Sequence, residues 1–290
     1  MDKRYSQEAP KQRSFLSAKY IFGRKQSRSA SSEPPPYESI TGSPTKIIHK
    51  ISSTRGMPED ALEFLRQYDT VILVDDSQSM THCGSTRGVS RWCEARQALQ
   101  TLAEIAHKYD EDGIDIHFLN AKHSATNIRS SSQIHEVFDQ VKPSGMTPTG
   151  DRLDKLLKPY LTKLETADIQ PDGTPIDRQT GKEIKRINYI VITDGVPTDD
   201  PKNPIVDAAT RLKAIRNLSM VQLGIQFVQI GNDEEATRSL KMLDDDLSKE
   251  SGIWDIVDTT PYSELSPVTG DGLVKALLGG INRRVDAQNK

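Results

Sequence analysis

One uninterrupted aliphatic run, Val71 to Val74, constrains the fold more than any other segment of this 290-residue chain. It follows Asp69-Thr70 and ends at Asp75, with no polar residue inside it. A strand with one solvated face alternates apolar and polar residues, whereas a strand that is buried on both faces is apolar throughout. The run therefore predicts a central strand of a parallel sheet that helices cover on both sides.

Strand-like and helix-like patterns alternate along the rest of the chain. Apolar residues recur at intervals of three and four in the helical segments, and Ser90 stands where an N-cap is expected. The alternation predicts an α/β fold, with a doubly wound, mostly parallel central sheet flanked by helices. A Pro-Asp-Gly-Thr-Pro turn within about 167–186 predicts an inserted hairpin. The predicted strands are 69–75, 114–119, 187–193, 225–230 and 254–257, and the predicted helices are 60–68, 90–109, 134–141, 153–161, 208–218, 234–247 and 273–285.

Charge and composition set the N-terminal part of the chain apart. Residues 1–30 contain eight Lys or Arg and two acidic residues, a charge of +6, whereas the whole chain carries −3. Hydrophobic residues make up 35% of the chain, below the roughly 45–50% of globular domains, so part of the chain is expected to be disordered. We expect a disordered, basic, Ser- and Pro-rich tail over 1–57, a folded domain over 58–285 and a short tail over 286–290.

Composition also argues against several classes of protein. A net charge of −3 disfavours binding of nucleic acid over the whole surface, and no specific nucleic-acid partner is expected. No apolar run approaches the roughly 18 residues that span a bilayer. Cys83 and Cys93 are the only cysteines, which excludes a disulfide framework. Residues 1–31 lack the apolar stretch of a secretory signal, so we expect a cytoplasmic protein.

The tail carries one short recognition motif, Pro34-Pro35-Pro36-Tyr37. Consecutive prolines favour the extended polyproline II helix, which loses little entropy when it docks. Pro34, Pro35 and Tyr37 match the P-P-x-Y pattern that WW domains bind in aromatic grooves. WW domains are common in ubiquitin ligases, so such a ligase is a hypothetical partner.

The basic charge of the tail suggests a second hypothesis. Aromatic and aliphatic residues between Phe15 and Phe22 lie among Lys19, Arg24 and Lys25, which would suit weak contact with an acidic lipid surface. A mitochondrial presequence is an alternative that the early acidic residues disfavour. A solvated tail without either role is the simplest interpretation.

Polar residues follow the strongest strands at the point where each strand ends. Asp75, Ser77 and Ser79 follow the first strand at alternate positions, Asp194 follows a later one, and the polar turn 145–150 adds further hydroxyls. In open parallel sheets, ligands bind beyond the carboxyl ends of the strands, where the winding reverses. Oxygen ligands without histidine or thiol suit Mg²⁺ or Mn²⁺ rather than zinc or copper.

Three motifs in this order resemble the von Willebrand factor type A (vWA) domain family: Asp-x-Ser-x-Ser at 75–79, Gly-x-Thr at 145–147 and Thr-Asp-Gly at 193–195. The resemblance implies the Rossmann-like vWA fold, of an intracellular type. It also implies a metal-ion-dependent adhesion site (MIDAS), where an acidic residue of a partner protein completes the shell of a bound Mg²⁺. Carried over by motif position, the implied metal ligands are Asp75, Ser77, Ser79, Thr147 and Asp194.

Some positions depart from the family pattern or leave a choice open. Asp76 stands where many members have glycine, and its carboxylate either points to solvent or raises the affinity for the cation. Thr149 offers a second hydroxyl two positions after Thr147. Asp199 and Asp200 add negative charge near the rim of the predicted site.

These observations favour a protein–protein interaction module, not an enzyme, which binds an acidic partner residue through Mg²⁺. The alternative is a metal-dependent hydrolase or phosphotransferase that uses the same oxygen ligands, although no general base is evident. A third hypothesis is a domain that has lost its metal and binds partners through its surface alone.

Overall fold

The computed structural model divides the chain into two compact units, 1–51 and 52–290, and every described residue belongs to the second. The sequence motif Pro34, Pro35 and Tyr37 and the tails predicted at 1–57 and 286–290 lie outside the described residues. The described residues are 64–108, 112–249, 252–265 and 268–278.

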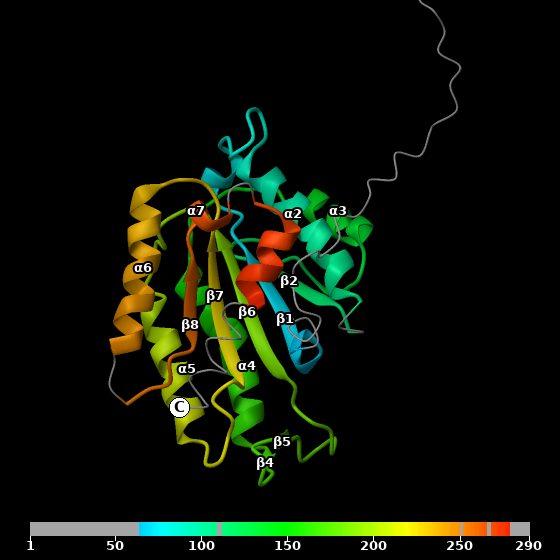
Figure 1. Cartoon of the computed structure of the whole chain (residues 1–290), viewed down its shortest axis with the longest axis vertical. Coiled ribbons are helices and arrows are strands. Elements are labelled where there is room, and N and C mark those ends of the chain that lie inside the picture. The colour runs from blue at the N-terminus through cyan, green and yellow to red at the C-terminus, as the bar shows by residue number, and fades with distance from the viewer. Residues whose placement is uncertain (1–63, 109–111, 250–251, 266–267, 279–290) are drawn as a thin grey trace, which may run out of the picture. The chain divides into compact units, whose positions relative to one another are not determined.

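The strands that the structure describes are β1 (Tyr68–Val74), β2 (Ile114–Phe118), β3 (Ser124–Ile128), β4 (Asp168–Ile169), β5 (Pro175–Ile176), β6 (Arg186–Thr193), β7 (Leu223–Gln229) and β8 (Val257–Thr260). Six of them form one sheet in the order β3-β2-β1-β6-β7-β8 (Figure 1). Neighbouring strands in this sheet are parallel, except that β2 and β3 are antiparallel. β4 and β5 form a separate antiparallel hairpin within the segment where an insertion was predicted.

Helices cover both faces of the sheet. The helix formed by residues 270–278 packs with α2 and α3 in one hydrophobic core, and α4, α5 and α6 enclose a second core. This arrangement confirms the predicted α/β class, with a mostly parallel sheet flanked by helices. None of the helices in the described ranges is long and apolar enough to cross a membrane. The helices are η1 (Phe64–Gln67), η2 (Gln78–Thr81), α2 (Arg91–Ala106), α3 (Ser131–Asp139), α4 (Thr149–Glu165), α5 (Lys202–Ala214), α6 (Glu234–Lys249) and α7 (Tyr262–Leu265), of which η1 and η2 are 3-10 turns.

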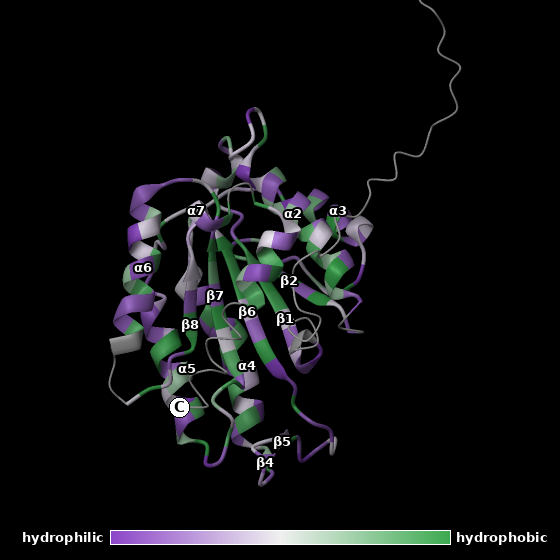
Figure 2. Ribbon diagram, viewed as in Figure 1, coloured by the Kyte–Doolittle hydropathy of each residue, from purple (hydrophilic) through white to green (hydrophobic). Residues whose placement is uncertain are grey.

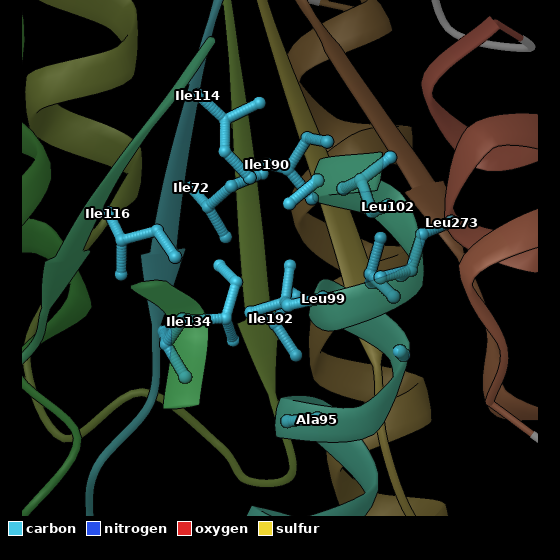
Figure 3. Packing of buried hydrophobic residues seen from close by; sticks show 14 of the residues in the cluster. Ile72, Ala95, Leu99, Leu102, Ile114, Ile116, Ile134, Ile190, Ile192 and Leu273 are labelled. Carbon is cyan, nitrogen blue, oxygen red and sulfur yellow. The ribbon is translucent and has the colours of Figure 1, made fainter. Parts of the chain in front are cut away.

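Alternate residues of the central strands enter the two cores. In β1, Ile72 and Val74 belong to the core with α2 and α3, whereas Val71 and Leu73 belong to the core with α4 and α5. Figure 3 shows Ile72 and Leu99 within the first of these cores. Figure 2 shows hydrophobic residues concentrated on the central strands and hydrophilic residues on the outer sides of the helices. The predicted burial of β1 on both faces is therefore confirmed.

The structure corrects several details of the predicted elements. The helix predicted at 208–218 is α5, which begins at Lys202 and ends at Ala214. Where it is described, the helix predicted at 60–68 is a single 3-10 turn, and Tyr68 already belongs to β1. The strand predicted at 254–257 starts only at Val257. The edge strand β3 was not predicted, because its Ser-Ala-Thr-Asn-Ile sequence is largely exposed and has no apolar periodicity.

The order of the strands places the change in winding direction between β1 and β6. From β1 the chain continues to β2 and β3 on one side, and from β6 it continues to β7 and β8 on the other. Val74 pairs with Ile192 at this point, so Asp75 leaves the sheet beside Thr193, the last residue of β6. Ligands of open parallel sheets bind at such a position.

Candidate metal centre

Asp75 is the first residue beyond β1 and is fully buried. Its amide donates to the carbonyl oxygen of Ile192 (2.8 Å), which fixes it beside the end of β6. Its carboxylate oxygens accept hydrogen bonds from the Ser77 amide (2.8 Å) and from the Thr193 hydroxyl (2.6 Å). Burial raises the pKa of Asp75 to about 6, although these hydrogen bonds oppose the shift. A cation beside this carboxylate would favour its ionised form.

Ser77, Ser79 and Asp194 form a continuous chain of hydrogen bonds. The two serine Oγ atoms lie 3.0 Å apart, and Ser79 Oγ donates to Asp194 Oδ1 (2.7 Å). Ser77 and Asp194 are almost completely buried. A hydroxyl that donates its proton to a carboxylate still has oxygen lone pairs, and a metal ligand needs those lone pairs.

Thr147 joins this group from the loop before α4. A Cβ atom added to Gly195 would lie 3.9 Å from Thr147 Oγ1 and 4.0 Å from Ser79 Oγ, so both hydroxyls border the same small space. The Gln78 amide donates to the Gly145 carbonyl oxygen (3.2 Å), which ties the two loops together. The three motifs that are separated in the sequence therefore meet at one place.

Thr149, the alternative hydroxyl, has a different environment. It is fully buried at the start of α4, and its Oγ1 donates to the carbonyl oxygen of Thr147 (3.5 Å). The backbone of Thr147 is held by Thr198, whose Oγ1 accepts from the Thr147 amide (3.2 Å). Of the two threonines, Thr147 is the one whose hydroxyl borders Ser79 and Gly195.

Asp76 does not point to solvent, the first of the two alternatives that the sequence left open, and an effect on cation affinity stays a prediction. Its side chain is buried and accepts three hydrogen bonds from the loop after β2: from the Asn120 amide (2.7 Å), from Asn120 Nδ2 (3.0 Å) and from the Ala121 amide (2.9 Å). Asn120 Nδ2 also donates to the carbonyl oxygen of Met146, the residue before Thr147 (2.8 Å). The carboxylate of Asp76 therefore positions two loops of the site and does not point to solvent.

Asp199 and Asp200 cap helices. Asp199 accepts from the amides of Gly150 (2.9 Å) and Asp151 (2.7 Å), which are unpaired donors in the first turn of α4. Asp200 accepts from the Lys202 amide (2.9 Å) at the start of α5. Negative charge at these helix N-termini is stabilising. Their carboxylates therefore have a structural role beside the site.

Sequence reasoning missed one residue of this region, Arg91. Its Nη1 donates to Asp194 Oδ2 at 2.5 Å, and the pair is largely enclosed, with side-chain exposures of 15% for Arg91 and 0% for Asp194. The available signal was its position in the first turn of α2, where a positive charge opposes the helix dipole. A cation at that position suggests an acidic partner elsewhere in the fold.

The residues present fit a hard divalent cation. Asp75, Ser77, Ser79, Thr147 and Asp194 supply only oxygen atoms, and these suit Mg²⁺ or Mn²⁺. Within the described ranges, no group of three or more His, Cys, Asp and Glu side chains is placed to hold a metal ion. Because only two of the five predicted ligands are carboxylates, a centre of this kind depends on hydroxyl ligands. Metal binding by these five residues stays a prediction.

No protein-family model matches the chain, and no curated protein matches it. Among solved structures, the chain is similar to a point mutant of the PilB minor pilin from Streptococcus sanguinis, with 12% sequence identity and a TM-score of 0.44. The similarity covers 76% of this chain and 61% of the pilin chain, so this chain spans less than two thirds of the pilin's length. A likeness at this level assigns neither a family nor a function.

Proposed function

We propose that this protein is a vWA-type interaction module, which binds an acidic residue of a partner protein through Mg²⁺ or Mn²⁺ at a MIDAS. The observation that carries the proposal is the convergence of three loops. The side chains of Asp75, Ser77, Ser79 and Asp194 lie within one hydrogen-bonded group, and the Thr147 hydroxyl borders the same space. Five oxygen-bearing side chains from distant parts of the chain would hold the cation.

The charges of these residues favour an anionic partner. Asp75 and Asp194 supply two negative charges, Arg91 supplies one positive charge, and the hydroxyl ligands are neutral. With a bound divalent ion, the charges of these side chains and the ion would sum to +1, and the ion would still accept a further oxygen ligand. The carboxylate of a partner's Asp, Glu or C-terminus has the charge and the chemistry to supply that ligand.

Calorimetric titration of the full chain with MgCl₂ tests the metal site. We expect wild-type protein to bind Mg²⁺, and we expect Asp75→Ala and Asp194→Ala to weaken binding at least about tenfold while the circular dichroism spectrum stays that of a folded domain. The matched control is Asp200→Asn, which removes an exposed carboxylate that caps α5 and should leave affinity unchanged. Equal affinity in wild type and both alanine variants would refute the proposal.

Affinity capture from a cell extract tests the acidic partner. Proteins that bind wild type in Mg²⁺, leave it in EDTA and do not bind Asp194→Ala are candidates for carboxylate recognition.

The alternative function is a hydrolase or phosphotransferase at the same site. It would be supported by turnover of a phosphoester library that EDTA abolishes. Metal analysis of the purified protein separates both from a domain that binds partners without metal.

The tail suggests a second interaction. Pro34, Pro35 and Tyr37 would recruit a WW-domain protein such as a ubiquitin ligase, in a cytoplasmic setting, and the basic residues before them would add weak contact with acidic membranes. A peptide of residues 30–42 should bind members of a WW-domain panel, and the Tyr37→Ala peptide should not. Absence of binding by the wild-type peptide would remove this part of the proposal.

A further inference from the structure

Arg91 reaches the candidate metal centre from a different element than any predicted ligand. It is the first residue of α2, and its Nη1 lies 2.5 Å from Asp194 Oδ2. The other oxygen of the same carboxylate, Oδ1, accepts the hydrogen bond from Ser79. Asp194 is therefore shared between a resident positive charge and the chain of hydroxyls that would hold the metal.

The fold leaves room for the Arg91 side chain at one specific position. Gly231 follows β7 with a φ of +78°, and a Cβ atom there would lie 2.5 Å from Arg91 Nε and 2.8 Å from Arg91 Cζ. Any larger residue would collide with the guanidinium. The guanidinium therefore packs over Gly231 and against Asp194, with only 15% of the Arg91 side chain exposed.

This placement carries energetic costs that point to a function. A positive charge in the first turn of a helix is unfavourable. Arg91 Nε is buried and has no hydrogen-bond partner among the described residues. A buried donor without a partner destabilises the folded state. The ion pair with Asp194 offsets these costs. Without Arg91, the charge of Asp194 would be buried beside Asp75 with no cation near it.

We propose, on the basis of the function proposed above, that Arg91 is the internal counter-cation of the site and lowers its affinity for divalent metal. Without metal, the guanidinium balances the charge of Asp194 and holds the carboxylate in place. An arriving Mg²⁺ must compete with Arg91 for the same carboxylate, and the two positive charges repel each other. Arg91 thus sets the metal concentration at which the site becomes competent for a carboxylate partner.

The test compares Mg²⁺ affinity in the full chain for wild type, Arg91→Met and Arg91→Lys. Methionine fills similar space without charge, and lysine is the matched control because it keeps the charge. We expect Arg91→Met to bind Mg²⁺ at least about tenfold more tightly than wild type, since the competing charge is gone. Arg91→Lys keeps a positive charge beside Asp194 and should stay within about threefold of wild type. Unchanged or weaker binding by Arg91→Met would show a purely structural role and overturn the inference.

A measurement on wild-type protein covers the case in which Arg91→Met does not fold. The guanidinium protons of Arg91 can be followed by ¹⁵N-edited NMR as MgCl₂ is added. The inference requires these signals to shift and their exchange with water to become faster as Mg²⁺ saturates the site. Saturation without any change at Arg91 would contradict it.

These outcomes separate the inference from the function on which it rests. If neither wild type nor Arg91→Met binds Mg²⁺, the proposed metal site itself is wrong, and the inference falls with it. If both bind with the same affinity, the metal site stands and only the role of Arg91 is refuted. Tighter binding by Arg91→Met supports both.

Discussion

The two ends of the parallel sheet both bury polar groups, but in opposite electrostatic states. At the carboxyl ends of β1 and β6, Asp75 and Asp194 are buried together, and Arg91 is the one cation that bonds to either of them among the described residues. At the amino end of β6, the side chains of Tyr160 and Gln222 form a neutral pair. Tyr160 donates to the Lys185 carbonyl oxygen (2.8 Å), and Gln222 Nε2 donates to the Tyr160 hydroxyl (2.8 Å).

The two ends of the sheet differ in whether their polar groups are paired and their charges balanced, and this difference indicates which end would bind a ligand. In the Tyr160–Gln222 pair at the amino end each donor has an acceptor, and Gln222 Nε2 also lies 3.1 Å from the Ile184 carbonyl oxygen, so this pair leaves no donor for a ligand to satisfy. At the carboxyl end, negative charge exceeds positive charge in a buried space, which is unfavourable without a further cation. A neutral, fully paired cluster stabilises the fold, whereas a charged, incompletely balanced cluster suggests a ligand.

The largest loss of stability is expected on substitution of Asp76. This residue is an exception to the comparison, because it is a buried carboxylate at the carboxyl end with a structural role. Its hydrogen bonds go to Asn120 and Ala121 and not to the candidate site. Hydrogen bonds to a charged group are each worth about 1.5–3 kcal/mol, so the loss of three of them in Asp76→Ala should lower the free energy of unfolding by at least about 4.5 kcal/mol. Urea denaturation in EDTA measures this loss.

The control for Asp76 is Asp139→Ala, which removes an exposed carboxylate that pairs with Arg96 and His135 on the surface. Exposed ion pairs contribute about 0–1 kcal/mol, so this variant should be close to wild type. An Asp76→Ala variant as stable as Asp139→Ala would mean that Asp76 does not anchor the loops.

The second prediction is the part of the pH dependence of folding stability that comes from the ionisation of Asp75. Its pKa is raised by burial to about 6 in the folded protein from an ordinary value of 3.8. The folded state therefore binds this proton more readily than the unfolded state does. The resulting stabilisation is complete below about pH 3.8 and is lost as pH rises through about 6, with a total of roughly 3 kcal/mol.

Denaturation of wild type and Asp75→Asn in EDTA between pH 4 and 7 measures this contribution. The stability of wild type relative to Asp75→Asn should fall as pH rises across that window, because asparagine does not titrate. Saturating Mg²⁺ should remove the fall by favouring the ionised carboxylate. A constant difference between the two proteins would show that Asp75 is not electrostatically penalised in the fold.

The sheet and most helices could be predicted because they depend on local patterns. The meeting of the three motifs could be predicted because each stands at the end of a predicted strand or in the order that the vWA family has. The apolar composition of Val71 to Val74 is by itself enough to predict that β1 is buried on both faces. The roles of Asp76 and Arg91 could not be predicted in the same way. Their partners lie 44 and 103 positions away in the chain, so only the folded geometry brings them together.

The smallest effect is expected at the amino end of the sheet, at Tyr160. In Tyr160→Phe, the Lys185 carbonyl oxygen can still accept from Gln222 Nε2 (3.3 Å), and that nitrogen keeps the Ile184 carbonyl oxygen as an acceptor. Because little is left unpaired, the loss of stability should be about 1 kcal/mol. Neither Mg²⁺ affinity nor the pH dependence assigned to Asp75 should change. Denaturation and calorimetry on this one variant therefore test both halves of the comparison, and any change in Mg²⁺ binding would mean that the two ends of the sheet are coupled.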